Sequence, residues 1–182
     1  MLHEVLTASL NGQLNIVQDF IDCDFSDNHG NTPLIYSAIG GHLEIVQYLV
    51  EKGVDINLQN DNGNSALILA AGNSHFEIVQ YLVEKGADIN LQNKYGNTAR
   101  MLATSFGKLE VVKYLPYQNV VNYAGFSDLM LAAREHRLEV VRYLLESGNY
   151  AEEEIRKVSR ATRGSTIPEI EYLLGDYLNY SI

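Results

Sequence analysis

Histidine side chains carry the most obvious chemical potential in this sequence, because an imidazole can bind a metal or transfer a proton near neutral pH. They are dispersed along the chain, at His3, His29, His42, His75 and His136. His42 and His75 stand in the similar contexts Gly-His-Leu-Glu and Ser-His-Phe-Glu, 33 residues apart. If these contexts belong to neighbouring helix pairs, the two backbones lie about 10 Å apart and the rings could share a metal. The alternative, which we favour, is that each ring makes a local structural hydrogen bond, so we predict no metal site.

No other motif supports catalysis or cofactor binding. Cys23 is the single cysteine, and no Ser or Cys lies in a recognisable nucleophile motif. Residues 55–60 approach a calcium-loop pattern but have Asn60 where the turn needs Gly, and no Glu follows at the required distance. A Gly-Lys-Ser or Gly-Lys-Thr phosphate loop is also absent. We therefore expect no cofactor and no enzymatic activity.

The composition is that of a folded, acidic protein. Of the 182 residues 46% are hydrophobic and 20% charged, with a formal net charge of -10. This charge argues against general nucleic-acid binding, which depends on Lys and Arg displacing counterions. The start of the chain lacks a basic opening followed by an apolar run, and no segment has a membrane-spanning length of apolar sequence. We predict a cytoplasmic monomer that binds neither nucleic acid nor membrane.

An internal repeat is the dominant feature of the sequence. The decapeptide Glu-Ile-Val-Gln-Tyr-Leu-Val-Glu-Lys-Gly occupies residues 44–53 and again residues 77–86. A column of glycines recurs at intervals of 33 or 29 residues, at Gly30, Gly63, Gly96 and Gly125. A column of tyrosines has the same intervals, at Tyr48, Tyr81, Tyr114, Tyr143 and Tyr172. These columns divide the chain into six units, at 2–27, 28–60, 61–93, 94–122, 123–151 and 152–182.

Each unit has the local signals of a turn followed by two helices. The column Gly permits the positive φ of a tight turn. A Ser or Thr that can cap a first helix follows, as at Thr32. In the second helix, apolar residues such as Ile45, Val46 and Leu49 fall on one face. A helix pair of this size cannot bury that face alone, so neighbouring pairs must stack.

A Gly turn followed by two helices at a spacing of 33 residues resembles the ankyrin repeat family. The resemblance is carried by Gly-Asn-Thr-Pro-Leu at 30–34, Gly-His-Leu-Glu-Ile-Val at 41–46, Gly-Val-Asp-Ile-Asn at 53–57 and Gly-Ala-Asp-Ile-Asn at 86–90. It is strong over residues 28–115, good over 125–148 and weak at both ends. The family usually has a turn-bracing His in a Thr-Pro-Leu-His motif. Here that column holds Ile35, Ile68, Met101 and Met130, so this bracing is absent.

The resemblance implies an all-α, ankyrin-type solenoid of stacked helix-turn-helix units joined by β-turn or hairpin loops. We predict about twelve helices, without an extended sheet, in a single domain over residues 1–182. Units 2–27 and 152–182 are expected to form the N- and C-terminal caps. The resemblance also implies a concave surface, lined by hairpin tips and first helices, that in this family binds other proteins.

One loop is shorter than its equivalent in the preceding unit. Residues 116–124 are four fewer than residues 83–95 at the corresponding place. Pro116 lacks an N–H and should end its helix early. We expect the missing residues to come from the hairpin finger, which would be truncated there.

Exposed aromatic residues indicate where a partner binds on the concave side. Tyr95, Phe106, Tyr123 and Phe126 fall on positions that face solvent in the family, and exposed aromatics without a packing role indicate an interface. For Tyr123 and Phe126 the alternative is that they fold into the gap beside the shortened loop. The predicted partner-binding residues are Asn28, His29, Asn31, Ile39, Asp61, Asn62, Asn64, Asn73, Lys94, Tyr95, Asn97, Ser105, Phe106, Tyr123, Phe126, Arg134 and Glu135.

Three functions remain open at this point. The chain could be a non-catalytic protein-interaction module whose partner is selected by the concave face. It could instead be an inhibitor or regulator, or an effector delivered to a host cytosol, that occludes the active site of an enzyme partner. An enzyme built on a repeat scaffold is the third alternative. The unit 94–122 is basic and the first half is acidic, which would suit a partner that presents basic groups to the first half.

Arg100 is anomalous because its column otherwise holds Leu34, Leu67 and Leu129. A guanidinium at a core position must either be paired or extend to water. Asp128, one column earlier in the next unit, is the candidate partner, and extension to solvent is the alternative. We expect Arg100→Leu to be neutral or stabilising, as apolar replacement of a buried pair often is.

Overall fold

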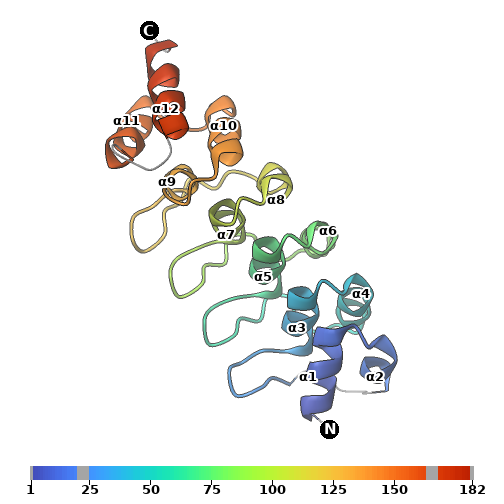
Figure 1. The fold of residues 1–182 in the computed structure, drawn as a ribbon. Helices are drawn as coiled ribbons and strands as arrows, with labels where there is room; N and C mark the ends of the chain where they lie inside the picture. Colours follow the sequence, from blue (N-terminus) through green and yellow to red (C-terminus); the bar gives the residue numbers. More distant parts are fainter. Residues whose placement is uncertain (1, 20–24, 163–167, 181–182) are drawn as a thin grey trace.

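The chain forms an all-helical repeat fold. The computed structural model describes residues 2–19, 25–162 and 168–180 (Figure 1). Within these ranges there are twelve helices and no strands, which confirms the predicted fold class. The helices are α1 (Leu2–Asn11), α2 (Leu14–Gln18), α3 (Pro33–Gly40), α4 (Leu43–Glu51), α5 (Ala66–Asn73), α6 (Phe76–Glu84), α7 (Ala99–Ser105), α8 (Leu109–Tyr114), α9 (Asp128–Arg134), α10 (Leu138–Glu146), α11 (Glu152–Ala161) and α12 (Pro168–Tyr180).

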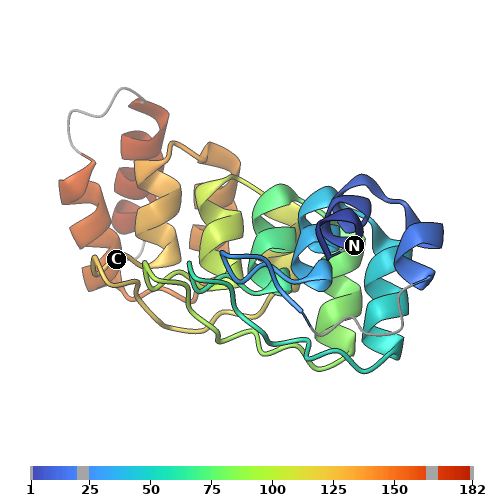
Figure 2. The same ribbon diagram turned by 90° about the horizontal axis from the view of Figure 1, so that it is seen from below.

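Consecutive helices form pairs, and the pairs stack into an elongated, two-layered molecule (Figure 1). The odd-numbered helices make an inner row in which each packs against the next, from α1 to α11. The even-numbered helices pack in the same way along an outer row. Loops project from one end of the inner helices and run beneath them in Figure 2. The turns at their tips are called finger 1 (residues 27–31), finger 2 (60–64), finger 3 (93–97) and finger 4 (122–126).

The core lies between the two rows because the repeated apolar pattern faces inward in every unit. In α4 and α6 the repeated sequence buries Leu49 and Leu82, each with 0% exposure. Small residues allow the inner helices to approach closely, and Ala38, Ala70 and Ala103 are likewise fully buried. Apolar side chains thus form one continuous cluster along the stack.

The predicted caps begin the inner helices. Thr32 Oγ1 accepts a hydrogen bond from the Ile35 N–H at 3.2 Å. Ser65, Thr98 and Ser127 cap α5, α7 and α9 in the same way. These bonds satisfy N–H groups that have no partner within the helix, so the start of each inner helix is fixed by its own sequence.

The shortened unit keeps its finger, so the prediction of a truncated finger is wrong. Within finger 4, the Asn122 N–H donates to the Phe126 carbonyl at 3.0 Å, and the Gly125 N–H donates to the Asn122 carbonyl at 2.8 Å. Finger 3 has the same two bonds, at 3.0 and 2.8 Å. The residues are missing instead from the last turn of the outer helix, since α8 ends at Tyr114, directly before Leu115 and Pro116. The predicted early end of this helix is confirmed.

Arg100 is buried and paired, so of the two alternatives the pairing with Asp128 is confirmed. Its Nε donates to Asp128 Oδ2 at 2.9 Å, and each residue is only 4% exposed. Arg100 Nη1 also donates to the carbonyls of Val112 and Leu115, at the end of the shortened α8. Carbonyls at a helix end lack intrahelical partners, so Arg100 supplies the donors that the missing turn would have provided.

Candidate functional site

Each finger is braced by an Asp or Asn side chain that the sequence analysis did not single out. Asp27 begins finger 1, and its Oδ1 accepts the N–H groups of His29 and Asn31, both at 2.8 Å. In fingers 2, 3 and 4 the same role falls to Asn60, Asn93 and Asn122, through pairs of bonds of 3.0 to 3.1 Å. The signal was present in the sequence as an Asp or Asn three residues before each turn Gly. Each finger is therefore braced from within by its own first side chain.

Asparagines also join each finger to the next, which gives some of the predicted binding residues a structural role. Asn60 Nδ2 donates to Asn31 Oδ1 at 2.7 Å. Asn64 and Asn97 accept equivalent bonds from the following finger, at 3.1 and 2.9 Å. The backbone adds one bond per step, such as the Lys94 N–H to the Asn62 carbonyl at 2.9 Å. The fingers therefore form one bonded row, and the amides of Asn31, Asn64 and Asn97 are engaged within it.

Three predicted aromatic residues are strongly exposed. Tyr95 is 62% exposed, Phe106 54% and Tyr123 73%. Tyr95 and Tyr123 lie on adjacent fingers, linked by the bond from the Tyr123 N–H to the Tyr95 carbonyl at 3.1 Å. Phe106 lies at the opposite end of α7 from its finger. The aromatic residues thus lie at two levels, the fingers and the far end of α7, and do not form a single patch.

For Tyr123 and Phe126 the sequence left open whether the ring is exposed or folds inward beside the shortened loop. Tyr123 is exposed, whereas Phe126 folds inward. Phe126 is partly buried and packs against the core. The Arg134 guanidinium lies over its ring, 5.0 Å from the centroid. Tyr123 remains outside, and Lys94 approaches the ring of Tyr95 at 5.4 Å. Cations placed over aromatic faces are attracted to the ring quadrupole, so Lys94 and Arg134 are held beside the rings.

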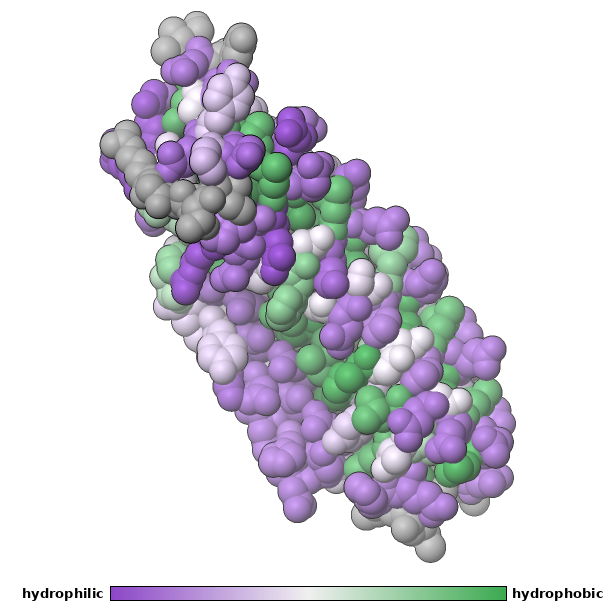
Figure 3. Space-filling view, in the orientation of Figure 1, coloured by the Kyte–Doolittle hydropathy of each residue, from purple (hydrophilic) through white to green (hydrophobic). Residues whose placement is uncertain are grey.

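The remaining predicted residues lie on the tips of the fingers or at the far ends of the inner helices. On the fingers, Asn28, His29, Asp61 and Asn62 are exposed. At the helix ends, Asn73 and Glu135 are exposed while Ile39 and Ser105 are partly buried. The hydropathy of this side follows the same division, because hydrophilic residues cover the fingers and apolar residues gather over the helices (Figure 3).

His42 and His75 make structural hydrogen bonds, as the favoured alternative predicted, but the bonds reach the preceding unit and are not local. His42 Nε2 lies 2.8 Å from the Leu10 carbonyl, and His75 Nε2 lies 3.0 Å from the Ile39 carbonyl. A carbonyl only accepts, so Nε2 carries the proton in each ring. Arg137, in the same column, donates from Nε to the Ser105 carbonyl at 2.8 Å. Each of these residues joins its unit to the preceding one, and no group of three potential metal ligands occurs among the described residues.

The carboxyl group of Asp27, at the start of finger 1, has a shifted pKa. Burial acts to raise the pKa of Asp27, but hydrogen bonds from the Tyr36 hydroxyl, Asn31 and the His29 backbone outweigh it and lower that pKa far below the usual range. The Tyr36 hydroxyl donates to Asp27 Oδ2 at 2.7 Å. All these bonds lie within finger 1 or at its base, so the shift reflects bracing of the finger.

Comparison with protein families agrees with this geometry. The family model for ankyrin repeats (3 copies) matches residues 5–93 and 85–155. The chain belongs to the ankyrin repeat family. Ankyrin repeats are generally protein–protein interaction modules and are typically non-catalytic. A search of curated proteins found no match to this ankyrin repeat chain. Among the described residues of the ankyrin repeat stack, no helix is long and apolar enough to cross a membrane.

Proposed function

We propose that the chain is a non-catalytic interaction domain, extending over residues 1–182, that binds a protein partner through its concave side. The observation that carries the proposal is the exposure of Tyr95, Phe106 and Tyr123, at 62%, 54% and 73%. Aromatic side chains lose little conformational entropy when they bind and contribute strongly to interface energies. Three exposed aromatic side chains on the side that binds partners in this family are therefore candidates for interface anchors.

The spacing of these residues indicates the kind of partner. Tyr95 and Tyr123 lie on fingers at the start of α7 and α9, whereas Phe106 follows the last residue of α7. A helix of this length, 7 residues, rises about 10 Å. A partner that contacts all three rings must therefore cover both the fingers and the inner helices. This favours a folded protein surface of ordinary interface size, about 800 Å² per partner, over a single short segment.

Lys94 and Arg134 add charge to this half of the concave side. Both are exposed, and both are held next to aromatic rings. The partner surface that meets the third and fourth fingers is therefore expected to be apolar with acidic groups at its edge.

The test uses the double variant Tyr95→Ala with Phe106→Ala. Partners are captured from a lysate of the source organism on the wild-type chain, identified, and purified for titration. We expect the double variant to weaken binding by more than about 2 kcal/mol, the scale of interface hot spots, with a nearly unchanged melting temperature. Tyr172→Ala with Leu58→Ala is the matched control, because these residues are 71% and 43% exposed at other places. Undiminished binding by the concave-side variant, or loss of its fold, would contradict the proposal.

The same captured partner separates simple binding from inhibition. If the partner is an enzyme, its activity is measured with and without a saturating amount of this chain. If the wild-type chain inhibits the enzyme and the double variant does not, the chain is a regulator that occludes an active site.

A further inference from the structure

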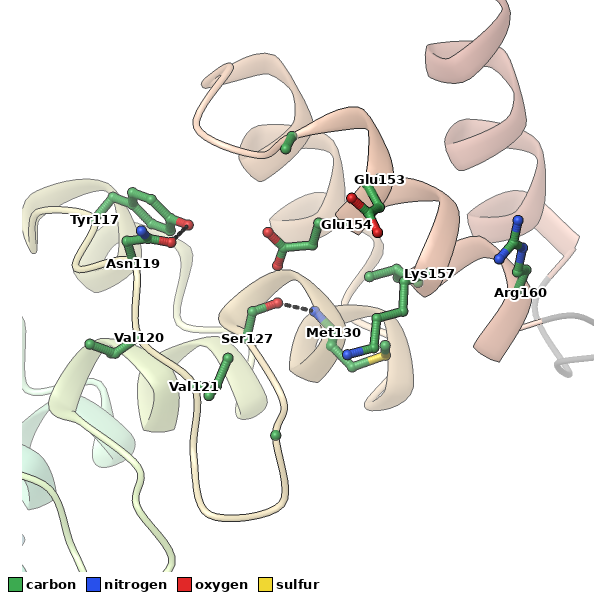
Figure 4. Close-up of a pocket in the computed structure, with 13 residues that line it drawn as sticks. Tyr117, Asn119, Val120, Val121, Ser127, Met130, Glu153, Glu154, Lys157 and Arg160 are labelled. Atoms are coloured by element: carbon green, nitrogen blue, oxygen red, sulfur yellow. Dashed lines mark hydrogen bonds between the residues drawn. The ribbon is translucent and has the colours of Figure 1, made fainter.

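A groove lies beside finger 4, where the repeat pattern is broken. Only residues 147–151 connect α10 to α11, whereas residues 115–127 connect α8 to α9 and include finger 4. The last helix pair therefore has no finger, and finger 4 has no successor (Figure 1). Between its outer edge and α11 there is a groove of about 520 Å³ (Figure 4).

The open edge shows the space that a further finger would have filled. A Cβ on the turn Gly of finger 2 or finger 3 would come within 2.9 Å or 2.5 Å of the following finger. Nothing lies within 4 Å of the equivalent point at Gly125 in finger 4. The carbonyls of His29, Asn62 and Tyr95 each accept an N–H from the next finger. The equivalent carbonyl of finger 4, that of Ala124, has no such donor among the described residues.

Side chains along this edge have also become apolar. In the preceding units a Gln side chain bridges to the next unit: Gln59 Nε2 donates to the Gln92 carbonyl at 3.0 Å, and Gln92 Nε2 donates to the Val121 carbonyl at 3.5 Å. Val121 occupies that column directly before finger 4 and is 54% exposed, and its neighbour Val120 is 38% exposed. A backbone carbonyl without a donor, flanked by exposed valines, is suited to an extended chain, which can combine a main-chain hydrogen bond with side-chain packing.

The opposite wall carries charges in a defined order. Glu153 and Glu154 lie in the first turn of α11, and Glu154 is close enough to Tyr117 to raise the pKa of its phenol, although burial is the larger cause. Lys157 lies one turn further along and extends over the groove near Met130 (Figure 4). Within the described part of the chain it forms no ion pair, unlike its neighbour Arg156, which pairs with Glu152. The groove is therefore acidic near Tyr117 and basic toward Lys157.

We propose that this groove binds an extended segment of a partner protein, laid along the outer edge of finger 4 in place of the missing finger. The segment carries an apolar side chain against Val120 and Val121, and an acidic side chain that pairs with Lys157. Its backbone N–H can donate to the Ala124 carbonyl, as the N–H of Tyr123 does to Tyr95. This site is separate from the concave side and does not depend on the function proposed for it.

A phage-displayed library of random twelve-residue peptides, selected on the immobilised full chain, supplies the probe. We expect selected peptides to bind in solution, and Val121→Arg or Lys157→Glu each to weaken them by at least about tenfold. Leu58→Arg is the matched control, since Leu58 is also exposed, at 43%, but precedes a finger that has a successor. The control and the Tyr95→Ala, Phe106→Ala variant should bind the peptides normally. Exchanging the acidic residue of a selected peptide for Lys should recover most of the affinity lost in Lys157→Glu.

Several results would overturn the proposal. A library that yields no binder, or binders that tolerate both groove variants, would show that the edge does not recognise extended chains. Peptides displaced by the Tyr95 and Phe106 changes would assign them to the concave side. A concentration-dependent dimer that Val121→Arg abolishes, measured by sedimentation equilibrium, would make a second copy the occupant.

Discussion

Replacing Arg100 by Leu should destabilise the fold, which reverses the expectation from sequence alone. Leu restores the residue type of the column, but it leaves the Asp128 carboxylate buried without its cation. It also removes the donors to the Val112 and Leu115 carbonyls. Removing one partner of a buried ion pair typically costs about 3 to 5 kcal/mol. The Tyr150 hydroxyl and the Leu129 N–H still donate to Asp128, so we expect the lower end of this range.

A double variant tests whether the unpaired charge is the cause. Arg100→Leu with Asp128→Ala gives both α7 and α9 the Ala-Leu start that α5 has at Ala66 and Leu67. The double variant removes the unpaired charge but does not restore the donors to the Val112 and Leu115 carbonyls, so it should regain part of the lost stability. Asp128→Ala alone leaves the guanidinium buried and should again be destabilising.

Urea unfolding monitored by circular dichroism provides the four free energies of the cycle. A loss of about 3 kcal/mol corresponds to a fall in melting temperature of about 6 to 12 °C for a chain of this size. A neutral Arg100→Leu variant would refute the argument that the pair is needed. If the double variant is no more stable than either single variant, an unpaired buried charge is not the cause of the loss in the single variants.

Two further predictions concern the fingers. Because the pKa of Asp27 is lowered in the folded state, its contribution to stability is present above the unfolded pKa of about 3.9 and is lost as the pH falls below it. Asp27→Asn, which matches Asn60 in finger 2, should flatten the decline in unfolding free energy between about pH 5 and 2.5, and an unchanged decline would exclude Asp27 as its source. Gly96→Ala combines a φ of 78° with a Cβ that would lie 2.5 Å from the Tyr123 nitrogen, whereas at Gly53 φ is 86° and nothing lies within 4 Å. Gly96→Ala and the control Gly53→Ala both carry the positive-φ cost of about 1 to 2 kcal/mol. The Gly96→Ala variant should therefore have the clearly lower unfolding free energy in urea. Equal losses in the two variants would mean that the contact between fingers 3 and 4 relaxes freely.

The repeat columns predict most of the fold because they depend on local rules. The caps at Thr32 and Ser65 and the buried faces of α4 and α6 follow from residue type and periodicity. The position of the deletion could not be derived in this way, since aligning the turn glycines leaves open whether a helix or a finger has lost residues. Pro116 indicated that the helix is the shortened element, and the hydrogen bonds of Asn122 show that the finger has kept its residues.

The candidate surface was predicted less completely, because it depends on contacts between units. Asn31 and Asn64 are polar residues on turns, and their sequence does not reveal that the next finger engages their amides. Tyr123 and Phe126 have similar character in the sequence, and the position of Arg134 over the Phe126 ring distinguishes them only in three dimensions. Exposure of Tyr95 and Phe106 could be predicted because family geometry fixes those positions.

The identical segment in α4 and α6 affects how the chain finds its register while folding. Each of these helices buries the same residues, Ile45, Val46 and Leu49 in one and Ile78, Val79 and Leu82 in the other. A folding chain could therefore dock residues 94–122 directly onto residues 28–60 and leave 61–93 looped out, with nearly the same apolar contacts at that one junction. The native order is favoured over this skipped register mainly by the extra unit that it buries, so a chain lacking residues 61–93 should still fold as a shorter stack.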